Sequence, residues 1–401
     1  MISVEKKALE FIEKNLYIFL IGFAFVLGLY LRFSMRYMIS GDCEEYYLTW
    51  YQDIKNLGGI KAIGTQIGDY SILYQLCLAL LTYLPIIPLY AMKAFSVFFD
   101  LLLAVLVAYL VGKNTSYEKK GAAAAFAFVW ISPVVAMNSA MWTQCDSIYT
   151  FFAILSVYFL YKEKHVKSMV FLGLAFAFKL QTIFIVPFFL FIYFYKKRFS
   201  ILYFLIAPLT MWITTIPGII GGHKLLDGFT IFFVQKAEYY LMEMNYPGFW
   251  MFTSYETFVE KYDYFDWLYT AGIILTVIVL AAWMVYTIKE KAEMNAKNFI
   301  GLCLLLTYTM VFFCPVMHER YGYIYEIVAI IYLFYNRKSA IPCALLQIMS
   351  ITTYAWYLMF IPRNLTLMAI LNLGVYIWYA ILYIRGIREE KNEEVSSLCK
   401  E

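Results

Sequence analysis

The chain has 401 residues, of which 63% are hydrophobic and 15% are charged, whereas soluble domains carry about 25% charged residues. One soluble core could not bury so much apolar surface, but lipid can cover it. The composition excludes an ordinary soluble protein, and with a net charge of only +4 we expect no nucleic-acid partner.

Apolar segments follow one another along the whole chain, so we expect an all-α fold of about twelve transmembrane helices in a single domain, 1–401. A spanning helix needs about 20 apolar residues, and fewer where it is partly buried. The charged N-terminus precedes a first span without a cleavage site, which favours a retained span over a signal peptide. The predicted spans lie near 16–34, 91–112, 121–138, 146–162, 167–179, 182–196, 200–218, 265–288, 297–315, 321–336, 340–358 and 365–386.

Positive residues cluster in alternate loops, and short loops rich in Lys and Arg are retained in the cytoplasm. Both termini are therefore predicted to be cytoplasmic, with a disordered tail at 389–401 and with long outer loops at 35–90 and 219–264. The clusters are Lys6 and Lys7; Lys113, Lys119 and Lys120; Lys162, Lys164 and Lys167; Lys196, Lys197 and Arg198; Lys289, Lys291 and Lys297; Arg337 and Lys338; Arg385 and Arg388.

Residues 70–86 are apolar enough to suggest another span, which would place every later basic cluster outside. We therefore predict a re-entrant or interfacial helix on the outer side, ended by Pro85 and Pro88. The half-length pair 167–179 and 182–196 is predicted to be a broken hairpin whose turn lies below the outer surface.

Ionisable residues gather on the predicted outer side, where they usually line a functional cavity. Asp42, Glu44 and Glu45 follow the first span in the sequence SGDCEE. Such closely spaced carboxylates can accept a proton or hold a cation. The alternative is a solvated loop in which Asp42 caps a helix that begins at Cys43.

Three further motifs lie on the same side. The first, at the turn between the third and fourth predicted spans, contains Trp142, Gln144 and Asp146. Interfacial anchoring by Trp142 and helix capping by Asp146 would explain those two residues but not Gln144.

The second motif contains Lys179 and Gln181 at the break in the hairpin. Lys179 ends an apolar run, where a cation would suit a phosphate at membrane depth; snorkelling to the surface is the alternative. The third is a tight turn with His318, Arg320 and Tyr321. Its Arg offers a planar fork of donors to a phosphate, and a Glu319–Arg320 ion pair is the alternative.

No cysteine pair has C-x-x-C spacing, and no motif has zinc-ligand spacing or a nucleophile triad. We expect Cys43 and Cys145 to be small buried thiols rather than a disulfide.

In combination, the acidic first outer loop, W-x-Q-x-D-S at 142–147, K-x-Q at 179–181 and H-E-R-Y at 318–321 resemble the GT-C superfamily of membrane glycosyltransferases. They are most similar to bacterial mannosyltransferases related to the enzyme that adds the second mannose to GPI anchors. The resemblance runs from Asp42 to Arg320 and implies inverting transfer of one sugar, expected to be mannose, from a polyprenyl-phosphate donor to a hydroxyl of a glycan or glycolipid.

The resemblance also implies residue roles. Asp42 would be the general base, although Glu44 or Glu45 could take that part, and a divalent cation at Asp42 and Glu44 is possible but not required. Lys179, His318 and Arg320 would stabilise the departing phosphate. The remaining substrate-binding set comprises Glu45, Trp142 stacked on the sugar, Gln144 and Asp146 on sugar hydroxyls, Gln181 and Tyr321.

A transporter or flippase of a lipid-linked saccharide is the alternative function. Transporters usually repeat a broken helix in matching halves, and here only one broken hairpin is predicted, so the enzyme is preferred. Compact loops favour a multi-pass protein of the bacterial plasma membrane over one of the endoplasmic reticulum.

Overall fold

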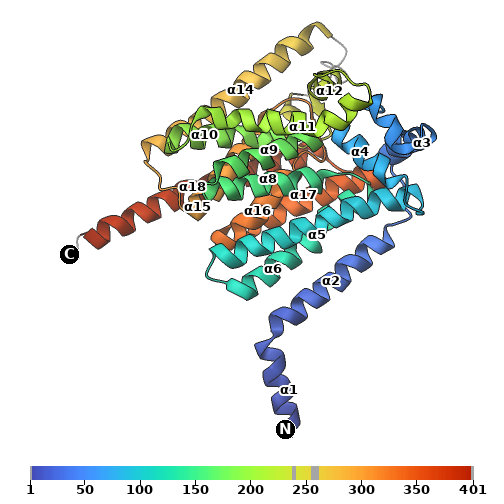
Figure 1. Cartoon of the computed structure of the whole chain (residues 1–401). Coiled ribbons are helices and arrows are strands. Elements are labelled where there is room, and N and C mark those ends of the chain that lie inside the picture. Colours follow the sequence, from blue (N-terminus) through green and yellow to red (C-terminus); the bar gives the residue numbers. More distant parts are fainter. Residues whose placement is uncertain (1, 237–240, 254–261, 399–401) are drawn as a thin grey trace.

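The computed structural model describes residues 2–236, 241–253 and 262–398, and helices dominate these parts of the chain (Figure 1). Within them, the named strands are two short ones, β1 (Glu243–Met244) and β2 (Met317–His318), which pair in parallel. The predicted all-α class is confirmed.

In the part of the chain that the structure describes, seven helices are long and apolar enough to cross a membrane, and an eighth crossing is possible where two helices meet at a 46° bend. The bent pair joins α6 (Glu118–Trp130) to the Pro133–Met141 segment. The seven are α2 (Leu16–Ser34), α5 (Pro88–Asn114), η5 with α11 (Ile201–Gly221), α14 (Tyr262–Lys289), α15 (Ala296–Phe313), η7 with α17 (Arg337–Met359) and α18 (Leu365–Leu398).

Four further apolar helices coincide with predicted spans but are shorter. They are α8 (Asp146–Tyr161), α9 (His165–Phe178), η4 with α10 (Leu180–Lys196) and α16 (Tyr323–Tyr335). All twelve predicted segments are thus helical, and a polytopic membrane protein is supported. The count of twelve spans stays a prediction.

The first predicted outer loop is itself helical, with η1 (Cys43–Tyr47), α3 (Leu48–Asn56), η2 (Gly59–Gly64) and α4 (Ile72–Leu81). Ten residues of α-helix reach about 15 Å, half of a bilayer core, so α4 cannot span alone. The second loop contains α12 (Asp227–Lys236), β1 and η6 (Phe249–Phe252), while its residues 237–240 and 254–261 lie outside the described residues.

The predicted break between the two half-length helices is confirmed. Lys179 has extended backbone angles (φ −154°, ψ 135°), a 3₁₀ turn follows at Leu180–Ile185, and α10 then begins at Val186. Close packing holds the hairpin in place: a Cβ on Gly173 of α9 would lie 2.4 Å from the carbonyl oxygen of Ala207 in α11.

The basic loops meet at one end of the bundle. Lys162 donates to Asn114 at 3.0 Å, and Arg198 pairs with Glu163 at 2.6 Å. The start of α2 lies at this end too, since Lys119 sits over the Tyr17 ring. We call this the basic end; α3 and α4 lie at the other, on the right of Figure 1, and we call that the α3–α4 end.

The prediction of a disordered tail is wrong over 389–398, because α18 continues as a helix to Leu398. Ion pairs hold this extension against neighbouring helices: Lys338 with Glu389 at 2.8 Å, and Lys391 with Glu290 at 2.6 Å. Residues 399–401 lie outside the described residues. Preceding α2 is a short helix, α1 (Ser3–Lys14).

A buried ion pair fastens α2 to the bundle. Arg32 binds Asp100 of α5 at 2.9 Å and donates to the carbonyl oxygen of Trp130 at 2.8 Å, while Ser139 donates to the same carboxylate oxygen. This pair fixes α2, and with it the start of the loop that carries Asp42.

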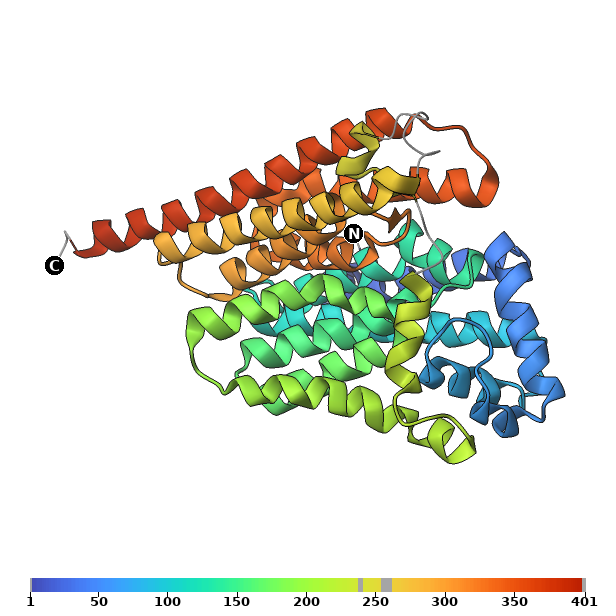
Figure 2. The ribbon, with the colours of Figure 1, turned by 90° about the horizontal axis from the view of Figure 1, so that it is seen from above.

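Two layers of helices define the interior (Figure 2). Helices α8, α9, α10 and α11 form one layer, and α14, α15, α17 and α18 lie on the other side. The site described below lies at the α3–α4 end, where residues from both layers meet the first long loop.

Candidate active site

The loop that carries Asp42 is held by two sets of hydrogen bonds. Lys93 of α5 donates to the carbonyl oxygens of Met35, Arg36 and Met38, at 3.3, 3.2 and 2.5 Å. These carbonyls follow the end of α2 at Ser34, so Lys93 pairs backbone acceptors that the helix itself does not. Ser40 donates to the carbonyl oxygen of Trp142 at 3.1 Å, which joins the loop to the turn that precedes α8.

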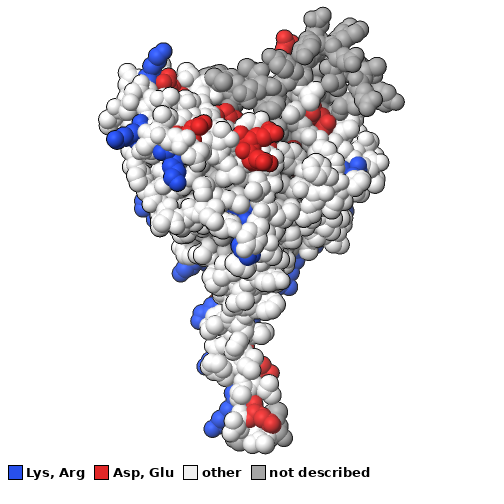
Figure 3. All heavy atoms as spheres, turned by 90° about the vertical axis from the view of Figure 1, so that its right-hand side faces the viewer, with Lys and Arg blue, Asp and Glu red and all other residues white. Residues whose placement is uncertain are grey.

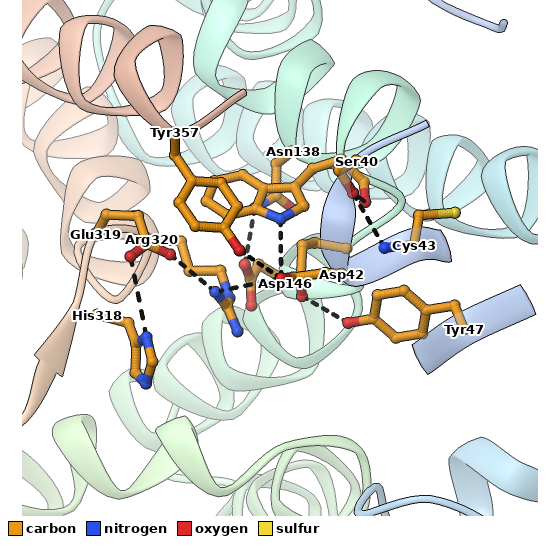
Figure 4. Close-up of polar contacts among 12 residues, drawn as sticks. Ser40, Asp42, Cys43, Tyr47, Asn138, Asp146, His318, Glu319, Arg320 and Tyr357 are labelled. Carbon is orange, nitrogen blue, oxygen red and sulfur yellow. Dashed lines mark hydrogen bonds and ion pairs between the residues drawn. The ribbon is translucent and has the colours of Figure 1, made fainter. Parts of the chain in front are cut away.

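Three side chains donate to the Asp42 carboxylate (Figure 4). Trp142 Nε1 and Gln144 Nε2 each lie 3.0 Å from Oδ2, and the Tyr357 hydroxyl lies 2.5 Å from Oδ1. Arg320 stands 3.8 Å away. A carboxylate has about four acceptor positions, so Asp42 is oriented by its neighbours and retains capacity toward a substrate.

The alternative of Asp42 as a helix cap is wrong, because its side chain makes no capping bond and Ser40 Oγ accepts from the Cys43 backbone instead. Glu44 and Glu45 are exposed and do not line the cavity described below. Of the three candidate carboxylates, the structure places only Asp42 among the other predicted site residues.

Behind Asp42 lies a second, buried group. Gln144 Oε1 accepts from Lys179 at 3.3 Å and from Tyr47 at 2.9 Å. Lys179 pairs with Asp146 at 2.5 Å, and Asn138 donates to the other oxygen of Asp146 at 2.7 Å. Lys179 is 4% exposed, so it does not snorkel.

This arrangement corrects three predicted roles. Trp142, Gln144 and Asp146 are almost fully buried and do not line the cavity, which speaks against Trp142 stacking on a sugar and against Gln144 and Asp146 holding its hydroxyls. The Trp142 ring stacks on Tyr357 with centroids 4.6 Å apart, and its N–H is used by Asp42. Lys179 is likewise occupied by Asp146 rather than open to a phosphate.

The turn between α15 and α16 forms the facing side of the site. Arg320 pairs with Glu319 at 2.9 Å, so the alternative proposed from the sequence is present, and Arg320 also lies over the Trp142 ring at 5.3 Å. Pairing of β1 with β2 brings the second long loop against His318. The same turn therefore contains the Glu319–Arg320 ion pair and forms one wall of the site.

Burial and the nearby cations Arg320 and Lys179 lower the pKa of His318 to about 3. His318 is consequently neutral at physiological pH and can donate or accept one hydrogen bond. Burial raises the pKa of Glu319, while attraction to Arg320 opposes that rise.

A polar cavity of about 280 Å³ opens at the α3–α4 end, in front of Asp42. This volume is near the lower end of the ~300–1,000 Å³ typical of small-molecule sites. Its lining residues are Asp42, Tyr46, Tyr47, Trp50, Asp69, Tyr70, Met244, Asn245, His318, Glu319, Arg320 and Tyr357.

A larger apolar groove of about 770 Å³ lies beside the cavity, between α9, η4 and α11 on one side and α14 and α15 on the other. Met317 and Tyr321 line this groove, whereas the three residues between them line the polar cavity. The turn thus separates the two spaces. Gln181 and Tyr321, two of the predicted substrate-binding residues, line this groove.

Several residues of the site carry no local sequence signal. Tyr357 comes from the last turn of α17. Tyr47 and Tyr70 reach Gln144 through contacts distant in sequence, whereas Asn138 binds Asp146 only eight positions away. Tyrosines are common in this chain, 37 in all, so their number does not single these out.

The described residues contain no group of three or more His, Cys, Asp or Glu that could hold a metal ion. Cys43 and Cys145 are buried free thiols, as expected.

Fold and site together define a polytopic membrane protein with a polar, carboxylate-bearing cavity beside an apolar groove. The family model for glycosyltransferase family 87 matches residues 70–315, more than half of the chain. The chain belongs to this family of glycosyltransferases.

The matched region includes Trp142, Gln144, Asp146 and Lys179, while Asp42 and the His318–Arg320 turn lie outside it. No curated protein matches the chain. Family membership supports the predicted membrane glycosyltransferase over the transporter. The narrower resemblance to GPI-anchor mannosyltransferases is not shown by it.

Proposed function

We propose that this glycosyltransferase moves one sugar, mannose on the sequence resemblance, from a polyprenyl-phosphate donor to a glycan or glycolipid hydroxyl, with inversion. The observation that carries the proposal is the junction at residues 317–321. A donor with a charged head and a long apolar tail requires a polar cavity and an apolar groove that adjoin, and these two meet at that turn.

In this arrangement the phosphate lies against Arg320 and His318. Arg320 supplies a planar fork of donors and neutralises charge on the leaving phosphate. His318, which is neutral, supplies one further hydrogen bond. The tail follows Met317 and Tyr321 into the groove.

Asp42 is proposed as the general base. An acceptor hydroxyl gives its proton to Asp42 while its oxygen attacks the sugar carbon from the face opposite the phosphate. The carbon–phosphate oxygen bond breaks, and the phosphate leaves as an anion. Trp142, Gln144 and Tyr357 hold the carboxylate in place, and of these three only Tyr357 also lines the cavity. Lys179 with Asp146 holds Gln144.

No divalent cation is needed in this mechanism. The Asp42 oxygens accept from three neutral donors and face Arg320. Glu44, the suggested second ligand, is exposed. A cation at Asp42 would be repelled by the guanidinium 3.8 Å away.

We further propose the GT-C architecture with twelve spans, both termini in the cytoplasm and the site on the outer face of the plasma membrane. The basic loops meet at one end and the site lies at the other. Short basic loops stay in the cytoplasm, which makes the α3–α4 end the outer one.

The proposed class of donor is tested by varying the length of its lipid tail. In proteoliposomes, KM would be measured for mannosyl phosphates carrying a long polyprenyl tail and a short prenyl tail. Ile273 lines the groove, and its neighbour Ile274 is 54% exposed and does not, so Ile273→Asn and Ile274→Asn form a matched pair.

Wild type and Ile274→Asn are expected to favour the long donor, and Ile273→Asn to lose that preference about tenfold, the cost of roughly one to two buried methylenes' transfer free energy. Equal KM values for long and short donors in wild type would contradict a groove-bound lipid tail.

A further inference from the structure

We propose that Tyr46, Trp50, Asp69 and Tyr70 form a sugar-binding subsite for the acceptor, so that the acceptor presents a sugar ring rather than a simple lipid alcohol or a peptide hydroxyl. This proposal rests on the proposed function and assigns the residues that hold the acceptor's sugar ring. All four residues line the polar cavity.

The direction in which the donor's lipid tail leaves the cavity indicates the side from which the acceptor approaches. The donor tail leaves the cavity past Met317 and Tyr321, on the side of the His318–Arg320 turn. In Figure 4 this turn and Tyr47 lie on opposite sides of Asp42. A hydroxyl that reaches Asp42 without crossing the donor must therefore approach from the wall built by the first long loop.

That wall presents aromatic rings at the cavity. Trp50 meets Tyr46 at 5.8 Å, Tyr47 at 5.4 Å and Tyr70 at 5.5 Å between centroids. Gly68, at φ +73°, lets the chain pass against the indole, because a Cβ there would come within 2.4 Å of it. The indole is thus fixed in place by its surroundings.

Core packing alone does not account for these rings. Tyr47 is buried and its hydroxyl donates to Gln144, so it is structural. Tyr46, in contrast, is 49% exposed at the cavity and Trp50 is half-buried. Aromatic rings offer rigid apolar area with a polar edge, which matches the C–H face of a sugar ring.

A carboxylate completes the chemistry. Asp69 lines the same cavity, and carboxylate oxygens accept hydrogen bonds from sugar hydroxyls. Figure 3 looks at this end of the molecule and shows Asp and Glu side chains gathered near its middle. On the acceptor side, such a surface favours neutral sugars over anionic acceptors.

The test is saturation-transfer difference NMR on the full chain in nanodiscs, without donor. The probes are methyl α-mannopyranoside and methyl β-galactopyranoside, with 1-octanol as the non-sugar comparison. The variants are Trp50→Leu and Tyr46→Leu, with Trp50→Phe as the conservative change and Trp267→Leu as the matched control, since Trp267 is 69% exposed and does not line the cavity.

Wild type and Trp267→Leu are expected to transfer saturation to the ring protons of at least one glycoside. Trp50→Leu is expected to weaken that affinity about tenfold, the value of one good aromatic contact, and Trp50→Phe to restore part of it. The proposal is overturned by no transfer to either glycoside, or by equal transfer in wild type and Trp50→Leu.

This readout is independent of turnover. If wild type binds glycosides but releases no polyprenyl phosphate from any donor, the subsite stands and the proposed function fails. If wild type consumes donor while Trp50→Leu binds glycosides like wild type, the function stands and the subsite fails.

Discussion

Two cation–carboxylate pairs lie next to each other in this protein, and the Gln144 side chain forms hydrogen bonds with both. In front, Asp42 and Arg320 face the cavity 3.8 Å apart, with side chains 17% and 14% exposed. Behind, Asp146 and Lys179 are buried and lie 2.5 Å apart. The front pair is open enough to admit a reacting group, whereas the rear pair is closed.

The difference between the two pairs shows that the type of a residue alone does not determine whether it contacts substrate. Both pairs look alike in the sequence, and both were expected to touch substrate. Burial distinguishes the two pairs. Charged groups that are out of water must find their hydrogen-bond partners within the protein, and only a pair with unused hydrogen-bonding capacity can bind a substrate. Each prediction below changes one side of this comparison.

The largest effect is expected at the front carboxylate. Asp42→Asn should lower kcat by about 10²–10⁴-fold, the range for loss of a general base, with the helical content unchanged. Glu44→Gln is the matched control and should stay within about twofold, because Glu44 is exposed. A reversed order, with Glu44→Gln inactive, would move the base to Glu44.

At the rear pair, the expected effect is on stability first. Lys179→Met leaves the Asp146 charge buried without its cation, which should lower the free energy of unfolding by about 3–5 kcal/mol. The double variant Lys179→Met, Asp146→Asn removes both charges and should recover most of that loss. Thermal unfolding of the purified variants measures this.

A rear pair that also held phosphate would behave differently. The stable double variant would then be as inactive as Asp42→Asn, whereas we expect it to retain activity at a reduced level, since Gln144 keeps its bond to Asp42.

His318 provides a pH test. Its pKa of about 3 means that it stays neutral from pH 5 to 8, so it takes up a proton only well below that range. His318→Asn should lower the rate about tenfold, through one lost hydrogen bond to the phosphate, without moving either limb of the pH–rate profile. An acid limb that vanishes in His318→Asn would show that His318 titrates near neutrality.

The removal of metal ions is expected to have the smallest effect on activity. Because Asp42 accepts from three neutral donors beside a guanidinium, chelation of divalent cations with EDTA should leave the rate of the purified protein unchanged. Activity that falls in EDTA and returns with added Mg²⁺ or Mn²⁺ would place a cation in the cavity.

Much of the fold could be predicted from the sequence. Apolar length and basic loops located the twelve helical segments, and Lys179 at the end of an apolar run located the break. The helical extension of α18 was missed because its stability comes from pairs such as Lys338–Glu389, which join residues 51 positions apart.

The site was only partly predictable. Asp42, His318 and Arg320 were identified from charge on one side of the membrane, and they line one cavity. Tyr357 reaches Asp42 across 315 positions of sequence from within an apolar helix, so no local pattern marks it. Trp142 and Gln144 were found, but which way they face depends on tertiary packing.

The most direct test of the account is donor cleavage by the purified, reconstituted protein. A panel of polyprenyl-phosphate sugars would be supplied with a glycoside acceptor, and mass spectrometry would follow free polyprenyl phosphate in wild type, Asp42→Asn and Arg320→Ala. We predict release by wild type from at least one donor, abolished in Asp42→Asn and reduced about 10²–10³-fold in Arg320→Ala. If no donor is consumed, but labelled lipid-linked sugar changes leaflet only when the protein is present, the account is contradicted and the protein moves lipid-linked sugars instead.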